Sequence, residues 1–268
     1  MTTVERQLLA SPRNYRYMLI VTAIVLILFA WSVSAVSFKD VNESGLRIAL
    51  NIVKGIVNPD LDLLLTVSKQ SVLYLLVQTV AIAFLGTLVG AVLSIPLAFL
   101  AASNIVPKPV SWLTRLLLIV IRTIPALVYG LMFIRVSGPG PFAGVLTIGL
   151  TSIGMLAKLY VDAIEELDTR VLESMTSIGC TTFEKIRFGI IPQLLSVFLS
   201  VTIYRFDMNM REASILGLVG AGGIGAPLTF AMNGYKWNQV GSILIGLVIL
   251  ILIIELFSNK LRAKLVRG

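Results

Sequence analysis

Five polar or charged residues interrupt a largely apolar stretch of the chain, and their types suit the handling of an anion. They lie within about two helical turns, in the order Arg205, Asp207, Asn209, Arg211 and Glu212. A charge at membrane depth is costly and usually faces a water-filled cavity or another charge. Arginine suits a phosphate-like oxyanion, because its planar guanidinium donates paired hydrogen bonds. The cluster predicts a polar translocation path; salt bridges that only stabilise helix packing or a dimer seam are the alternative.

The spacing within this cluster separates two sets of partners. Asp207 and Arg211 are four residues apart and can pair on one face of a helix. Arg205, Asn209 and Glu212 share another face. Asp207 and Glu212 therefore point in different directions, which makes them a poor pair for acid–base catalysis.

Basic residues also occur in two other apolar stretches. Arg115 and Arg122 are seven residues apart, on one helix face, and Arg122 lies close to Pro125. Arg122 fits either a role in the path or its gate, or a side chain that extends to the inner membrane interface. Lys158 and Asp162 are four residues apart, and we expect a local ion pair between them.

Composition excludes several kinds of chemistry. The chain has no histidine and a single cysteine, Cys180, which rules out histidine-based metal or acid–base chemistry and an internal disulfide. The run Gly220–Gly225 lacks the Lys-Ser/Thr of a phosphate-binding P-loop, and we interpret it as a close-packed turn. We find no nucleophile–base pair, metal cluster or nucleotide motif. We therefore expect that the chain is not an enzyme and binds no cofactor itself.

The elements that must position these residues are membrane-spanning helices. Apolar residues make up 57% of the chain and charged residues 13%, about half of the usual charged fraction. Runs of about 20 apolar residues can each cross a bilayer, and they lack the alternation of barrel strands. We predict an all-α integral membrane protein with six transmembrane helices, at 17–36, 72–102, 113–134, 142–161, 192–218 and 240–257.

Two of these spans carry local signals. Pro125 is expected to kink the third span, because proline removes a helical hydrogen bond. Gly86 and Gly90 in the second span are spaced so that two helix backbones can approach closely. The same glycines are also compatible with an ordinary helix.

The spans define three predicted domains. Residues 1–71 hold the first span as an anchor, for which a cleavable signal peptide is the alternative, and an external amphipathic helix at 44–57. Residues 72–258 form the transmembrane core, and residues 259–268 form a basic cytoplasmic tail. If both termini lie in the cytoplasm, the cytoplasmic segments carry more Lys and Arg than the external segments. We therefore predict that both termini are cytoplasmic. The net charge of +8 then reflects cytoplasmic loops and not nucleic-acid binding.

Residues 164–191 form a polar loop with a regular pattern. Apolar residues from Ile164 to Ile178 recur at steps of three and four, which indicates an amphipathic helix. Asp168 is placed to begin this helix as its N-cap, and Gly179 to end it in a left-handed conformation.

A second short helix is expected in the same loop. Thr181 and Glu184 have the spacing of a capping box, and the helix would present Phe183 and Ile186 before Pro192 marks the entry to the next span. These apolar faces need a partner, and a separate protein is favoured over the chain's own surface.

Two residues of this loop and the proline that follows it resemble the signature of a transporter family. Glu173, Gly179 six residues on and Pro192 thirteen further are similar to the E-A-A loop of ABC importer permeases, although Ser174 and Met175 replace its two alanines. Two more stretches, IRTIPALVYGLMFIRVSGPGPFAGVLTIGLTSIGMLAKLYVDAIEEL and YRFDMNMREASILGLVGAGGIGAPL, resemble phosphonate-type permeases. Together the resemblance covers most of residues 60–258.

The resemblance implies a type I ABC importer permease, with a five-span core plus the N-terminal span, in the bacterial plasma (inner) membrane. In that family the loop forms coupling helices that dock on a separate ATPase dimer, which binds ATP and Mg²⁺. A substrate-binding protein delivers the solute from outside, and we expect a second permease copy to complete a homodimer. Carried onto this chain, the residues coupling to the ATPase are Glu173, Gly179, Thr181, Phe183, Glu184, Ile186 and Pro192.

The expected function is ATP-driven import of a phosphonate or a related phosphorus oxyanion. The expected path residues are Arg122, Arg205, Asp207, Asn209, Arg211 and Glu212. A permease of the same fold for phosphate, phosphite or methionine is one alternative. A stand-alone secondary transporter is another; it would need no partner for the loop, and internal repeats would favour it, but we find no convincing repeat.

Overall fold

The computed structural model describes residues 15–35, 43–65 and 71–267, and every regular element in these ranges is helical. The helices are α2 (Tyr15–Ala35), α3 (Glu43–Val57), α4 (Leu61–Leu65), α5 (Val72–Ala101), α6 (Lys108–Thr123), α7 (Ala126–Ser137), α8 (Pro141–Glu165), α9 (Thr169–Ser177), α10 (Thr182–Glu184), the π-helical turn η2 (Lys185–Ile190), α11 (Ile191–Leu218), α12 (Gly225–Asn233) and α13 (Trp237–Arg267). The predicted all-α class is confirmed. The chain divides into two units, residues 1–50 and 51–268, which are described separately.

The first unit holds α2 and the first turns of α3. Helix α2 is long and apolar enough to cross a membrane and buries none of its side chains, as expected of a helix whose partner is lipid. Parts of the predicted N-terminal domain, residues 1–14, 36–42 and 66–70, lie outside the described residues. The amphipathic helix expected at 44–57 is found as α3.

Within the described residues, five helices are long and apolar enough to cross a membrane: α2, α5, α8, the continuous helix Thr182–Leu218, and α13. The remaining predicted span, the third, at 113–134, is broken and not merely kinked. Helices α6 and α7 meet at an angle of 84°, because Ile124 and Pro125 both adopt extended backbone. The Tyr129 hydroxyl donates to the Ile121 carbonyl across the break at 3.2 Å, which partners one carbonyl near the break.

Helices α5 and α8 form the centre of the second unit, and α11 packs against both. Their close approach depends on the two predicted glycines of α5. A Cβ atom at Gly86 would lie 2.6 Å from Ile148 Cγ2, and one at Gly90 would lie 2.5 Å from Ser152 Cβ. Any larger residue would separate the backbones, so the close-packing interpretation is confirmed.

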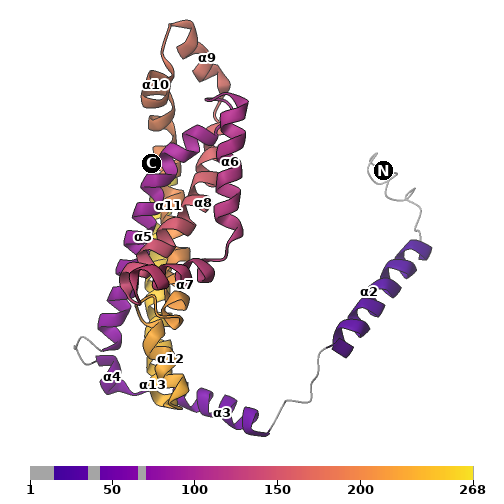
Figure 1. The fold of residues 1–268 in the computed structure, drawn as a ribbon, viewed down its shortest axis with the longest axis vertical. Coiled ribbons are helices and arrows are strands. Elements are labelled where there is room, and N and C mark those ends of the chain that lie inside the picture. Colours follow the sequence, from indigo (N-terminus) through magenta and orange to yellow (C-terminus); the bar gives the residue numbers. More distant parts are fainter. Residues whose placement is uncertain (1–14, 36–42, 66–70, 268) are drawn as a thin grey trace. The chain divides into compact units, whose positions relative to one another are not determined.

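The two ends of the second unit differ in construction (Figure 1). Helices α9 and α10 project from one end, where the last turns of α13 also lie, and α4 and α12 lie at the other end. The glycine run forms the predicted tight turn, with positive φ at Gly220, Gly222 and Gly223. Sequence reasoning missed α12, which follows this turn. The basic residues at 259–267, predicted as part of a cytoplasmic tail, form the last turns of α13.

Candidate functional site

Helix α9 begins and ends where the sequence predicts. The Asp168 side chain accepts a hydrogen bond from the Arg170 backbone N–H at 2.9 Å and acts as the N-cap. Gly179 has a φ of 83° just beyond the helix, a conformation that favours glycine. Both predictions are confirmed, and these two residues fix the length of the first helix in the loop.

The capping box of the second helix is also confirmed. The Thr181 N–H donates to Glu184 Oε2 at 2.7 Å, and the Glu184 N–H donates to Thr181 Oγ1 at 3.4 Å. Helix α10 continues through η2 into α11 without a break, a continuity that the sequence did not predict. Pro192 lies in the first turn of α11, directly after the π-helical turn η2. Proline has no backbone N–H, but at this position the regular α-helical hydrogen bonds have not yet begun, so the missing donor does not break the helix.

Close packing holds α9 against this continuous helix. Gly189 is buried, and a Cβ atom there would lie 2.5 Å from Met175 Sδ. Ile186 packs on the apolar cluster at this end of the bundle, which contains Ile164 and Ile190. Part of the loop's apolar face is therefore covered by the chain itself.

The tip of the loop presents a free apolar surface together with polar residues. Phe183 is 68% exposed and Ile178 is 78% exposed, and Glu173, Thr181 and Glu184 are exposed as well. Of the predicted coupling residues, only Ile186 is partly covered by the chain's own core. Gly179 and Pro192 are exposed at the surface of the loop and at the entry to α11, respectively.

The polar residues of α11 form two separate groups, as their spacing predicts. In the first group, Arg205 is buried, with Nη2 3.0 Å from Glu212 Oε2 and Nε 3.3 Å from Ser152 Oγ on α8. In the second, Arg211 Nη2 lies 2.9 Å from Asp207 Oδ2 and 3.6 Å from Glu255 on α13.

Asn209 joins three helices and lines none of the cavities described here. Its side chain is fully buried, and Nδ2 donates to Thr87 Oγ1 on α5 at 2.7 Å and to Ser152 Oγ on α8 at 2.8 Å. These contacts place Asn209 in the packing interface, so the role predicted for it in a path gains no support from its position.

Arg122, Arg205 and Glu212 come together at the break between α6 and α7. They line a cavity of about 260 Å³ with Pro125 and Thr151. The break exposes this space because the span turns away at Pro125. The site thus contains the buried guanidinium of Arg205, its partner Glu212 and the exposed Arg122. Two guanidinium groups in one cavity suit transient contact with an anion.

Sequence reasoning missed the two hydroxyl residues that complete this site. Thr151 and Ser152 are adjacent in an otherwise apolar part of α8, and both lie within 3.5 Å of the Arg205 guanidinium. Two neighbouring hydroxyl residues in a membrane span are a weak signal by themselves, since such groups often bond to their own helix.

The predicted ion pair between Lys158 and Asp162 is wrong. No ion pair within 4.0 Å joins them in the described part of the chain. They instead line a second cavity, of about 220 Å³, together with Arg115 and Arg122. Arg115 Nη2 pairs with Glu165 Oε1 at 2.5 Å at the end of α8. Two residues four apart can pair, but here both side chains face the neighbouring helix α6.

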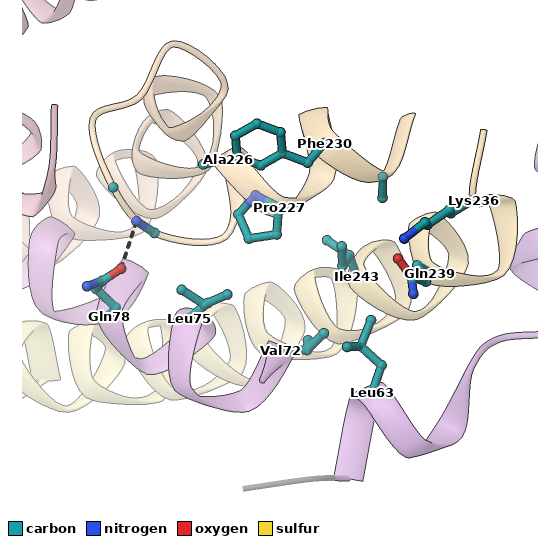
Figure 2. Close-up of a pocket in the computed structure, with 13 residues that line it drawn as sticks. Leu63, Val72, Leu75, Gln78, Ala226, Pro227, Phe230, Lys236, Gln239 and Ile243 are labelled. Atoms are coloured by element: carbon teal, nitrogen blue, oxygen red, sulfur yellow. Dashed lines mark hydrogen bonds between the residues drawn. The ribbon is translucent and has the colours of Figure 1, made fainter. Parts of the chain in front are cut away.

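A third and larger cavity, of about 520 Å³, lies at the other end of the bundle (Figure 2). Its walls are mainly apolar, with Leu75 and Ile243 on facing helices and Phe230 on α12. Gln78 accepts a hydrogen bond from the Gly223 N–H at 3.0 Å and ties the glycine turn to α5. Lys236 is the one charged residue among those lining it.

Helices long and apolar enough to cross a membrane, a projecting helical loop and arginines within an apolar span are typical of a multi-pass membrane transport component, and the comparisons agree. Residues 94–267 match the family described as the binding-protein-dependent transport system inner membrane component. The chain belongs to this family, whose members are permease components set in the inner membrane. No catalytic role is part of that description.

Two relatives are similar over the same share of the chain. The phosphate-import permease protein PhnE of Mycolicibacterium smegmatis is 37% identical over 70% of this chain, which corresponds to 36% of that relative, so the chain spans about a third of its length. The phosphite transport system permease protein PtxC of Stutzerimonas stutzeri is 35% identical over 70% of this chain and 68% of its own length.

A solved structure confirms the fold. An inward-facing conformation of the MetNI methionine ABC transporter aligns with 72% of this chain and 96% of its own chain, at a TM-score of 0.63 and 20% identity. The fold is therefore that of a type I ABC importer permease, as the loop signature predicts.

Proposed function

We propose that this chain is the permease subunit of an ATP-driven importer for a phosphorus oxyanion, of the phosphonate, phosphite or phosphate class. The observation that carries the substrate class is the cavity at the helix break, which both Arg122 and the buried Arg205 line. The two relatives named for phosphate and phosphite support the same class. The chain supplies the path and performs no bond chemistry.

The transported anion can exchange with Glu212 as the counter-ion of Arg205. The buried guanidinium is held by a carboxylate whose side chain is 29% exposed. An incoming oxyanion takes the place of Glu212 as the partner of Arg205, so no uncompensated buried charge arises during passage. When the anion leaves, Glu212 returns. This exchange keeps the affinity moderate, as conduction requires.

The loop α9–α10 is the proposed contact with the ATPase dimer. Phe183 and Ile178 are exposed large apolar side chains at its tip, and such anchors commonly fill a pocket on a partner. The capping box stiffens the loop, and the continuous helix from Thr182 to Leu218 links it directly to Arg205. Closure of the ATPase around ATP and Mg²⁺ would therefore move α11 and reshape the path.

A homodimer completes the proposed complex. The cavity at the α6–α7 break opens on the surface of a single chain, where Arg122 and Pro125 are exposed. A second copy would enclose it and exclude lipid. The substrate-binding protein is expected at the opposite end, near α4 and α12, if the α9–α10 end faces the cytoplasm with both termini.

The Arg205 side chain provides the direct test. In proteoliposomes that contain the complete complex, Arg205→Ala should abolish uptake of inorganic phosphate, phosphite and methylphosphonate. Arg205→Lys should keep the charge but lose the forked geometry, and we expect about tenfold slower uptake. Arg135→Lys, at the exposed end of α7, serves as the matched control. Uptake at the parent rate in Arg205→Ala would assign the group to helix packing alone.

A further inference from the structure

A second cluster of cations lies between α6 and α8, on the side of the first cavity that is nearer the α9–α10 end. Arg115, Arg122 and Lys158 line a cavity of about 220 Å³, whose remaining walls are Leu118, Ile119, Val161 and Asp162. Three positive side chains and one negative side chain thus surround a largely apolar hollow. Nothing in the family description assigns a role to this place.

The charges in this hollow are poorly neutralised by the protein. Arg115 is paired with Glu165, but Arg122, Lys158 and Asp162 take part in no ion pair within 4.0 Å in the described ranges. Arg122 and Lys158 line the same hollow without an ion-pair partner, so a bound anion would compensate their charges.

Packing holds Arg122 in place between the two cavities. A Cβ atom at Gly154 on α8 would lie 2.5 Å from Arg122 Cγ, so the stem of the arginine lies directly against this glycine. The same arginine lines the cavity that contains Arg205 and Glu212. One side chain therefore belongs to both hollows.

The positions of these residues along α6 and α8 show how the cations are ordered. Arg115 and Arg122 are seven residues apart, about 10 Å along α6. Lys158 follows Ser152, the hydrogen-bond partner of Arg205, by six residues, about 9 Å along α8. The cations therefore form a row that leads from Arg205 toward the α9–α10 end of the bundle.

We propose that the α6–α8 cavity is a second binding station for the transported tetrahedral oxyanion, which Arg122 passes from Arg205 to Lys158 and Arg115. This inference rests on the proposed function. Asp162 weakens the station by like-charge repulsion of the anion and so promotes its release. Two moderate stations in series allow movement without a deep trap.

The second binding station can be tested by removing the positive charge of Lys158 and then restoring it chemically. In a Cys180→Ser background of the complete reconstituted complex, Lys158→Cys should slow uptake of inorganic phosphate, phosphite and methylphosphonate by at least about fivefold, as expected when a charge-assisted contact is lost. Aminoethyl methanethiosulfonate, which restores a positive charge, should recover uptake. Sulfonatoethyl methanethiosulfonate, which adds a negative charge, should not.

Lys108→Cys is the matched control, because Lys108 is an exposed cation on the same helix α6 and lines neither cavity. It should transport at the background rate with or without either reagent. Parent-like uptake by Lys158→Cys, or equal rescue by both reagents, would overturn the station.

The failure of the station is distinguishable from failure of the proposed function. If the background complex moves none of the three anions, the proposed function fails and the station fails with it. If the background complex transports and Arg205→Ala abolishes transport, while Lys158→Cys has no effect, only the second station is overturned.

Discussion

Arg205 and Arg211 lie six residues apart on one helix, yet their surroundings differ. Arg205 is buried beside Glu212 and faces the cavity at the α6–α7 break, whereas the Arg211 side chain is 45% exposed and bridges Asp207 and Glu255. Local spacing predicts the partners within α11, because residues four or seven apart share a face. It cannot predict Ser152 or Glu255, which come from other helices.

Asn209 is the clearest case of a residue whose role depends on distant partners. Asn209→Ala removes the bonds to Thr87 and Ser152, and we expect it to lower stability by about 1–2 kcal/mol. Thermal unfolding in detergent measures this. Ser94→Ala, which loses a bond to its own helix at 2.6 Å and a longer one to α8 at 3.3 Å, should cost less. Equal losses for both variants would argue against Asn209 as the main polar link between the helices.

At the scale of elements, the projecting loop divides into a part that sequence predicts and a part that it does not. The N-cap of α9, its glycine stop and the capping box of α10 each depend on residues within a few positions, and all three are present. The continuous passage into α11 was not predicted. Neither was the close contact between Met175 and Gly189, which are distant enough in sequence to meet only in the folded loop.

That contact predicts a rescue. Gly189→Ala would place a Cβ atom 2.5 Å from Met175 Sδ, so the methionine side chain must leave its position against η2. We expect the looser packing of α9 to reduce the uptake obtained per ATP hydrolysed. Adding Met175→Ala removes the obstructing sulfur and should restore much of the coupling. The ratio of uptake to ATP hydrolysis in proteoliposomes is the measurement. If the double variant is as impaired as Gly189→Ala, the packing of α9 does not govern coupling.

At the scale of the whole molecule, hydropathy predicts the class and all but one of the spans. The broken pair α6–α7 was expected as one kinked helix, because a proline alone does not reveal how far the chain turns. The 84° angle depends on both Ile124 and Pro125 leaving the helical region. This turn opens the cavity that joins Arg122 to Arg205.

The single cysteine allows the orientation to be tested without engineering. Cys180 lies in the loop between α9 and α10 and is partly exposed. A membrane-impermeant maleimide should label it in inverted membrane vesicles and leave it unlabelled in intact spheroplasts. Denatured protein gives the full-labelling reference. The reverse pattern would place the loop outside and remove it from any cytoplasmic ATPase.

The central claim is that this bundle moves a phosphorus oxyanion only when an ATPase drives its projecting loop. The most direct measurement is uptake of radiolabelled phosphite and methylphosphonate by proteoliposomes that hold the permease and binding protein, with and without the ATPase subunit and ATP. We predict accumulation only when ATPase and ATP are both present, and none with a non-hydrolysable ATP analogue. Accumulation at the same rate without the ATPase would contradict the account.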